Sequence, residues 1–276
     1  SQAEKQISRY SKNRSRTRRN SQLRLFFYIM AGDRERAVQE ASKYYSSQDY
    51  KFAQYVKGKR IAIVGPAPTG ELLGDEIDQF DVIIRINYRG KTKLPPASEY
   101  GSNVHVSYYS NTNSKEVLYG KDNSYLDDLK FVVARNRFAA IRSQNQLSST
   151  NFRTMFTPNQ FYVTGKAQML QNILFDLMHF EPLEIKIFKS NFYMSEKRYY
   201  DSYYPDRRIY FGPNIWTDHA FHDLASQHIF SKAIMKNNPI YSDSSTTAVL
   251  DLSTDCYISR IQDIYANHLI NCFENI

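Results

Sequence analysis

The chain has 276 residues, enough for one α/β domain with a well-filled core. Hydrophobic residues make up 42% of it, but no apolar run approaches the roughly 18–20 residues of a membrane-spanning helix and no signal peptide is evident, so we expect a soluble protein. The net charge of +8 comes mostly from residues 1–24, which hold eight Lys and Arg against one acid, Glu4. We interpret this arm as a solvated leader or as a segment attracted to an anionic membrane surface or an acidic glycan. Nucleic acid is not expected, because no nucleic-acid-recognition fold accompanies the arm.

A helical pattern follows the arm. From Leu23 to about Val56, apolar residues recur at core-like spacing, with a break at Gly32-Asp33. Gly58 ends this section before the first strand. We therefore divide the chain into a basic arm with a helical extension, residues 1–57, and an α/β domain, residues 58–276.

The α/β domain begins with a short apolar run, Ile61 to Val64, that opens onto the small residues 65–70. Such a run predicts a buried first strand whose carboxyl end faces a phosphate-bearing ligand. A second strand is predicted at 82–86. Further strands are predicted at 104–106, 131–134 and 185–188, and helices at 165–180, 218–236 and 255–273. This alternation predicts a mostly parallel, Rossmann-like sheet flanked by helices.

Three blocks of this pattern resemble a known family. Gly74-x-Glu76-Ile77-Asp78, the second strand and Arg85-x-Asn87 together resemble the large sialylmotif of glycosyltransferase family 29. The turn Thr164-Gly165, with the helix and strand after it, resembles the small sialylmotif, in which the free N–H groups of a helix start face nucleotide or phosphate. The segment from Tyr100 to Asn111 also resembles the family, where a glycine-led strand ends near an asparagine.

The third block, Ala220 to Gln227, resembles the family's very small motif. By this resemblance His222 is the general base that deprotonates the acceptor hydroxyl, a role that suits a neutral imidazole at physiological pH. His219, one helical turn earlier, is the alternative base or a phosphate contact. Gln227 stands where the family has a glutamate, so a carboxylate that orients His222 is either missing or supplied from elsewhere, with Asp223 and Asp218 as the candidates.

The resemblance implies a sialyltransferase-like variant of the GT-A fold and an inverting transfer. The donor would be a CMP-activated ulosonic acid, sialic acid or Kdo, and the acceptor a glycan hydroxyl. No cofactor and no metal are expected, because CMP leaves with one phosphate; Asp127-Asp128 is not expected to bind a metal. Arg85 is interpreted as a donor contact or as an ion-pair partner of Asp78 or Asp81. The expected donor-binding residues are Gly65, Pro66, Ala67, Asn87, Asn111, Thr164 and Gly165.

The chain also departs from the family. Pro66 stands where the family usually has an asparagine. The aromatic third motif is matched only by a cluster within 198–204, interpreted as a sugar-stacking wall or as surface aromatics. The only cysteines, Cys256 and Cys272, lie outside the motifs and are expected to be buried free thiols. Because animal members join their large and small motifs by a disulfide, we expect a cytoplasmic, bacterial-type enzyme of capsule or lipopolysaccharide synthesis. The basic arm is compatible with a location peripheral to the inner membrane.

Two other functions are compatible with parts of the sequence. A Rossmann-type NAD(P)-dependent oxidoreductase is favoured by the opening strand and turn. It is disfavoured by the absence of G-x-G-x-x-G and of an acidic residue after the second strand, where Asn87 stands. A non-catalytic basic module that tethers a partner to membranes would explain the arm but not the three motif blocks.

Overall fold

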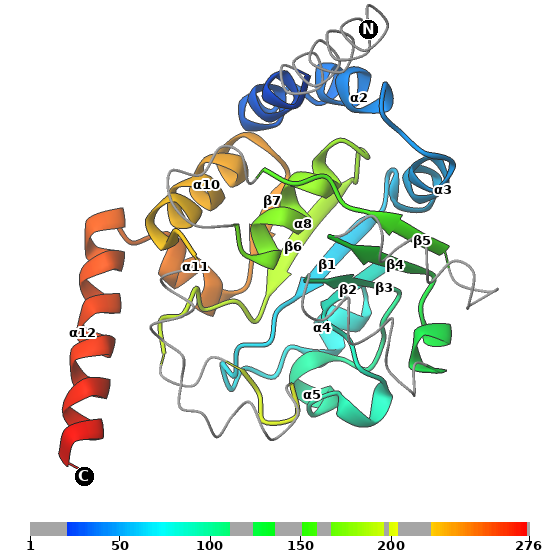
Figure 1. Cartoon of the computed structure of the whole chain (residues 1–276). Helices are drawn as coiled ribbons and strands as arrows, with labels where there is room; N and C mark the ends of the chain where they lie inside the picture. Colours follow the sequence, from blue (N-terminus) through cyan, green and yellow to red (C-terminus); the bar gives the residue numbers. More distant parts are fainter. Residues whose placement is uncertain are drawn as a thin grey trace, which may run out of the picture.

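The computed structural model describes residues 21–110, 124–135, 151–158, 167–195, 199–203 and 222–274. These residues form a seven-stranded parallel sheet with the strand order β5-β4-β3-β2-β1-β6-β7 (Figure 1). The predicted α/β class is therefore confirmed. The strands are β1 (Arg60–Val64), β2 (Val82–Ile86), β3 (Val106–Tyr109), β4 (Phe131–Ala134), β5 (Asn151–Thr154), β6 (Glu184–Phe188) and β7 (Ile240–Ser242).

The strand order reverses once, beside β1. The chain places β2 to β5 in succession on one side of β1 and then returns to place β6 on its other side, so Ile61 pairs with Val82 in β2 and with Ile185 in β6. In open parallel sheets, ligands bind outside the carboxyl ends of the strands at such a reversal. The topology therefore points to the loops after β1, β2 and β6.

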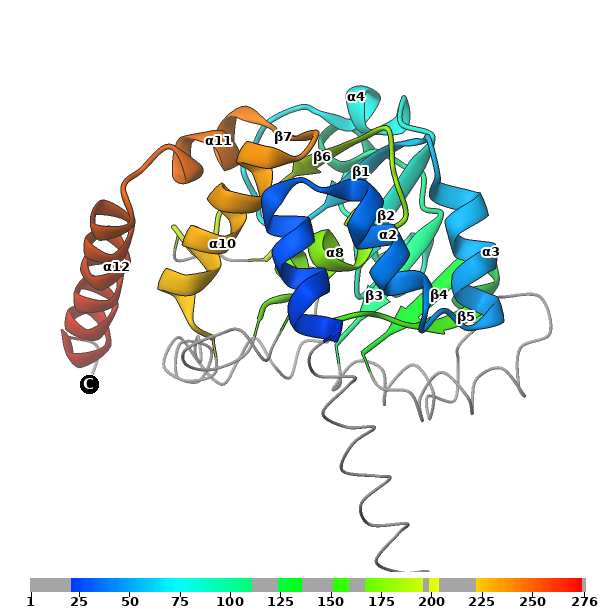
Figure 2. The ribbon, with the colours of Figure 1, turned by 90° about the horizontal axis from the view of Figure 1, so that it is seen from above.

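Helices cover both faces of the sheet. Residues 21–31 are helical, and further helices and 3₁₀ turns follow along the chain. Figure 2 shows α2, α3 and α8 on one side of the sheet and α4 on the other. The helices are α2 (Arg34–Ser42), α3 (Ser47–Val56), α4 (Gly74–Asp78), α5 (Ala97–Tyr100), α8 (Met169–Met178), α10 (Leu224–Asn237), α11 (Ser244–Leu250) and α12 (Thr254–Glu274), with 3₁₀ turns η1 (Lys91–Lys93) and η2 (Ser124–Asp128).

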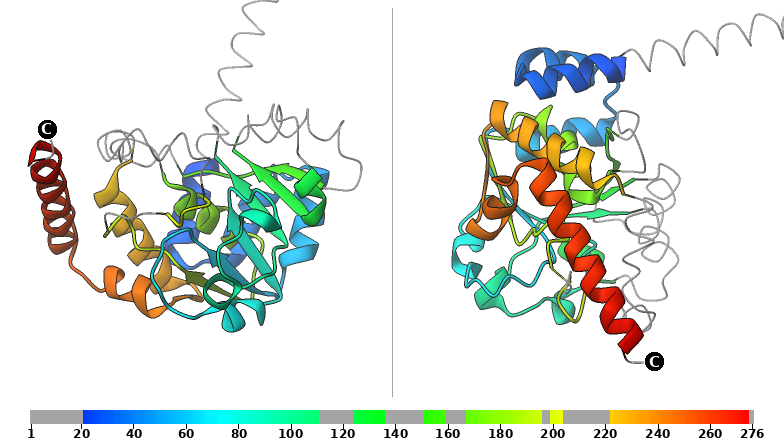
Figure 3. Two further views of the ribbon diagram at one scale, coloured as in Figure 1. Left: turned by 90° about the horizontal axis from the view of Figure 1, so that it is seen from below. Right: turned by 90° about the vertical axis from the view of Figure 1, so that its left-hand side faces the viewer.

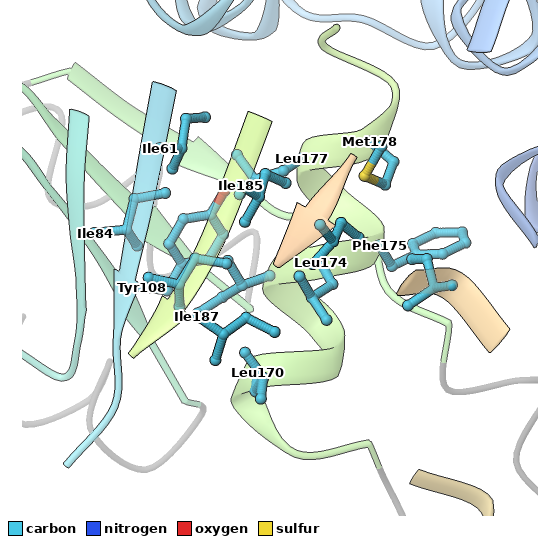
Figure 4. Close-up of a cluster of buried hydrophobic side chains, with 14 of the residues drawn as sticks. Ile61, Ile84, Tyr108, Leu170, Leu174, Phe175, Leu177, Met178, Ile185 and Ile187 are labelled. Atoms are coloured by element: carbon cyan, nitrogen blue, oxygen red, sulfur yellow. The ribbon is translucent and has the colours of Figure 1, made fainter. Parts of the chain in front are cut away.

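Alternate residues of β1 supply two different cores, as the two-residue period of a strand requires. Ile61 and Ile63 pack toward α8, whereas Ala62 and Val64 pack toward α4 and α5. Every residue of α8 from Leu170 to Met178 is buried, which explains why this helix is apolar around most of its surface. Figure 4 shows its leucines beside the isoleucines of the strands.

The N-terminal helices share the larger core with the sheet. Leu25 and Ile29 are buried in the same cluster as the strands, and the ring of Phe26 lies 6.3 Å from that of Phe175 in α8. The expected break at Gly32 is confirmed: its φ is 73°, and a Cβ there would lie 2.2 Å from the carbonyl oxygen of Asn237. A second break, at residues 43–46, was not predicted. The division at residue 57 stays a prediction.

Several predicted boundaries were wrong. The third strand begins at Val106, not 104, because the Nδ1 atom of His105 accepts the N–H of Ile83 at 2.9 Å, in place of a backbone acceptor. The helix expected from residue 165 begins at Met169, and the one expected from 218 begins at Leu224. Strands β5 and β7 and helix α11 were not predicted.

The C-terminal helix α12 was predicted almost to its ends. It packs against α10 near its start, where Tyr257 and Ile261 are buried, and its far end projects from the body (Figure 3). Cys256 is a free thiol with a partly exposed side chain, not the buried thiol that was expected. None of the described helices combines the length and apolar character that crossing a bilayer requires.

Candidate functional site

The loop after β1 is held against the end of β6 by backbone contacts. The N–H of Gly65 donates to the carbonyl of Phe188 at 2.8 Å, and that of Ala67 to the carbonyl of Lys189 at 3.0 Å. A Cβ at Gly65 would lie 2.4 Å from the Lys189 oxygen, so this glycine is explained by close packing. Pro66 and Pro68 carry no N–H. Within residues 65–68, no backbone N–H is therefore left for a phosphate.

Lys189 lies where the strand order of the sheet reverses. It follows β6 with a left-handed backbone (φ 57°), and it is 0% exposed. Its Nζ donates to Thr69 Oγ1 at 2.9 Å and to the carbonyl of Glu71, and it lies 4.9 Å from the ring centre of Tyr100. Burial lowers the pKa of Lys189. The lysine thus places a positive charge between β1 and β6 and fastens the 69–71 loop there. Sequence reasoning missed it; the signal was a lysine directly after an apolar strand.

Asn87 lies at the carboxyl end of β2 and is 5% exposed. Its φ is 54°, a left-handed conformation that asparagine adopts more readily than most residues. Its Nδ2 donates to the hydroxyl of Tyr203 at 3.0 Å, and its Oδ1 accepts the N–H of Ser110 at 3.2 Å. The side chain therefore joins the ends of β2 and β3 to the segment 199–203.

The aromatic residues of 199–203 form a wall of this site. Tyr203 is 4% exposed and stacks on Tyr199, with ring centres 5.0 Å apart. Tyr200 packs edge-on against Tyr203 and Tyr100, and its N–H donates to the carbonyl of Pro66 at 3.0 Å. Burial raises the pKa of Tyr200 to about 12, so it is neutral. Tyr203 is therefore not a surface aromatic residue, whereas Tyr199 and Tyr200 are half-buried.

Arg85 forms neither of the ion pairs considered for it. Its Nε donates to the carbonyl of Asn103 at 3.0 Å, and its Nη2 to the carbonyls of Tyr100 and Gly101 at 2.8 and 3.0 Å. Asp78 instead accepts N–H groups of the 101–103 loop, and Asp81 accepts the N–H of Arg60. Burial lowers the pKa of Arg85.

His222 and Asp223 lie at the start of α10. Asp223 is the N-cap, and its Oδ1 accepts the N–H of Ser226 at 3.0 Å. His222 therefore precedes the helix instead of lying on it, and its ring stacks beside that of Tyr193 with centres 6.5 Å apart. Gln227 Oε1 accepts the N–H of Gln168 at the start of α8, at 3.2 Å. The blocks that resemble the small and very small motifs are thus connected.

Four predicted site residues lie outside the described residues: His219, Asn111, Thr164 and Gly165. Asp128, considered as a metal ligand, accepts the hydroxyl of Tyr88 at 2.7 Å and lies 3.6 Å from Lys91 Nζ. Among the residues that the structure describes, no group of three His, Cys, Asp or Glu side chains is placed to hold a metal ion.

The fold and the contacts define an α/β protein with a candidate ligand site at the carboxyl edge of its sheet. No protein-family model matches the chain, and no curated protein matches it. Among solved structures, the chain is similar to one described as "Crystal Structure of a Mammalian Sialyltransferase", with 11% identity, a TM-score of 0.46, and coverage of 80% of this chain and 84% of that chain. Identity this low leaves function to be argued from the residues of this chain.

Proposed function

We propose that the protein is a glycosyltransferase that moves an acidic ulosonic sugar, sialic acid or Kdo, from its CMP form to a glycan hydroxyl. One observation carries this proposal. Segments that resemble family 29 motifs, and the aromatic cluster at 199–203, lie far apart in the sequence but contact one another at the carboxyl edge of one sheet. The contacts join Pro66 with Tyr200, Asn87 with Tyr203, and Gln168 with Gln227.

The nucleotide would lie along this edge, over the reversal point between β1 and β6. Lys189 supplies a positive charge there, and the N-terminus of α8 supplies a partial one. A single phosphate needs less charge neutralisation than a diphosphate, which suits this modest set of charges. The proposed contacts are the loop of Gly65, Pro66 and Ala67, together with Asn87, Asn111, Thr164 and Gly165.

In the proposed reaction the acceptor oxygen attacks the anomeric carbon from the face opposite the phosphate. The bond to the acceptor oxygen forms, the bond to the phosphate oxygen breaks, and the configuration inverts. His222 takes the proton of the acceptor hydroxyl, and His219 is the alternative base. CMP leaves as the product anion.

The two rival functions are weaker. A dinucleotide needs an acidic residue after the second strand to bind its ribose, and Asn87 stands there. It also needs backbone N–H groups for its pyrophosphate, and the N–H groups of Gly65 and Ala67 already donate to the carbonyls of Phe188 and Lys189. The membrane tether depends on an arm outside the described residues. A cytoplasmic, bacterial setting at the inner membrane belongs to the proposal through the family resemblance alone.

The decisive experiment is to incubate the purified protein with CMP-Neu5Ac or CMP-Kdo and a glycan acceptor, and to measure released CMP. We expect release with one of the two donors. A thermal-shift comparison comes first: CMP should raise the unfolding temperature and NAD should not. Stabilisation by NAD and not by CMP would instead favour the oxidoreductase.

A further inference from the structure

A small cavity opens at the carboxyl end of β2, between the loop after that strand and the segment 199–203. Its open space, including solvent at the mouth, is about 250 Å³. Three of its lining residues are basic (Arg85, Arg89 and Lys93), and none of the described lining residues is acidic. This is a positively charged recess beside Asn87, which also lines it.

The walls of this cavity are fixed by contacts from several elements. Ser202 Oγ donates to the carbonyl of Lys93 at 3.0 Å, which ties the segment 199–203 to η1. The amide of Asn87 holds Tyr203 on the same side. Gly90 has a φ of 100°, and a Cβ there would lie 3.2 Å from the Cβ of Tyr125, so the turn that follows Arg89 requires glycine. Such support orders the cavity before any ligand binds.

The charges around the cavity favour an anion. Arg85 is almost fully buried, and among the described residues its side chain donates hydrogen bonds to backbone carbonyls. Asp128, a carboxylate near this loop, accepts a hydrogen bond from the hydroxyl of Tyr88 and lies 3.6 Å from Lys91 Nζ. Lys91 does not line the cavity.

We propose that this cavity binds the carboxylate of the donor sugar, through Arg89 and Lys93. This inference rests on the proposed function. The cavity admits one functional group and not a nucleotide, and a guanidinium beside an ammonium matches the two oxygens of a carboxylate. Asn87 borders both this cavity and the proposed nucleotide site, so a sugar carboxylate here would lie next to CMP. The cavity would thereby select acidic sugars over neutral ones.

The test compares ligands that differ in the carboxylate. The variants Arg89→Gln and Lys93→Met keep side-chain length and remove charge, and Lys91→Met is the matched control on the same loop. Calorimetry without acceptor gives the affinities of each for CMP and for CMP-Neu5Ac or CMP-Kdo, whichever the parent binds. We expect the two cavity variants to bind the CMP-sugar about tenfold to a hundredfold more weakly. CMP affinity should stay unchanged in both, and Lys91→Met should bind both ligands as the parent does.

Retained CMP binding also shows that each variant is folded. Arg89→Lys, which keeps the charge, should recover part of the lost affinity. An equal loss for CMP and the CMP-sugar would mean that the cavity contacts the phosphate, and unchanged affinity for both would mean that it contacts neither; each result overturns the inference. If the parent protein binds CMP as tightly as the CMP-sugar, the inference about the cavity is also overturned, but the proposed function is not. A parent that binds neither ligand overturns the proposed function itself.

Discussion

The side-chain amide of Asn87 donates a hydrogen bond of 3.0 Å to the hydroxyl of Tyr203, 116 residues further along the chain. The same side chain accepts the N–H of Ser110, and its own backbone is left-handed. One residue therefore holds together two strand ends and the aromatic wall of the candidate site. Substitution of Asn87 acts on both the fold and the site.

We expect Asn87→Ala to lower the free energy of unfolding and CMP affinity by about 1–3 kcal/mol each, because buried groups lose their partners and alanine disfavours a left-handed backbone. Asn87→Gly keeps the backbone freedom and loses only the amide, and Tyr203→Phe removes only the hydroxyl. Urea unfolding and CMP calorimetry separate the two effects. Unchanged CMP affinity in both Asn87 variants would remove this residue from the nucleotide site.

Stability should fall in mild acid because of His179. Burial, together with the nearby charge of Arg153, lowers the pKa of this imidazole to about 3. Its folded pKa thus lies below the value of about 6.5 in the unfolded chain, which therefore binds a proton that the folded chain does not. The stability contributed by neutral His179 is complete above about pH 7 and is lost as the pH falls from about 6.5 toward 3.

The check is urea unfolding at about pH 7 and about pH 4, in the parent and in His179→Phe. Phenylalanine does not titrate and keeps aromatic contact with Phe156 and Phe180, whose rings lie beside that of His179. The variant should lose less stability than the parent between the two pH values. Equal losses would show that other groups set the acid sensitivity.

Removal of residues 1–20 should leave the fold and CMP binding intact. The deletion should stop at residue 20, because Ser21 is buried and donates to Glu40, which Arg24 also contacts at 2.9 Å. Although burial raises the pKa of Glu40, these hydrogen bonds and one from Lys43 lower it to about 2. Removal of residues 1–24 should therefore lower the unfolding temperature, whereas removal of 1–20 should only weaken salt-sensitive binding to anionic vesicles.

Transfer should survive chelation. The proposed neutralisation of the leaving phosphate uses Lys189 and the start of α8, so EDTA should leave CMP release unchanged. Turnover that EDTA abolishes and Mg²⁺ or Mn²⁺ restores would contradict the metal-free mechanism and return attention to Asp127-Asp128.

The sequence was sufficient to predict the strands that are marked by a local apolar pattern. The runs at 61–64, 82–86, 131–134 and 185–188 are apolar and bounded by turn residues, and each is a strand. Asn151–Thr154 carries no such signal, because its centre is Arg153. That arginine is buried in the sheet only because Asp49 and Asp176, from two other elements, neutralise it at 2.9 and 2.5 Å. A sequence pattern contains no such partner.

The site shows the same limit. The positions of Asn87 and of the glycine-containing turn at 65–70 were predictable from the sequence, because strand ends and small residues are local features. The partners were not: Tyr203 reaches Asn87, and Lys189 reaches Thr69, only through tertiary structure. The reason for a glycine at position 65 could not be told from the sequence either, since close packing against Lys189 and close approach of a phosphate both require a residue without a Cβ.

His222→Ala should cut turnover by about 10²–10⁴, the usual contribution of a positioned general base, and leave CMP binding largely intact. Asp223→Ala cannot separate capping from orientation of the imidazole. Loss of the N-cap destabilises α10 by about 0.5–2 kcal/mol and would also move His222. Asp223→Ser keeps a capping oxygen and removes the carboxylate, so it tests whether the carboxylate orients the imidazole. Near-normal turnover in Asp223→Ser would limit Asp223 to capping.

His219→Ala completes this set. If it is inactive while His222→Ala retains near-normal turnover, the two histidines exchange roles. If both variants stay active, proton removal from the acceptor proceeds without either ring. Neither histidine is then the base. The proposed transfer would in that case need another group at the carboxyl edge of the sheet to accept the proton.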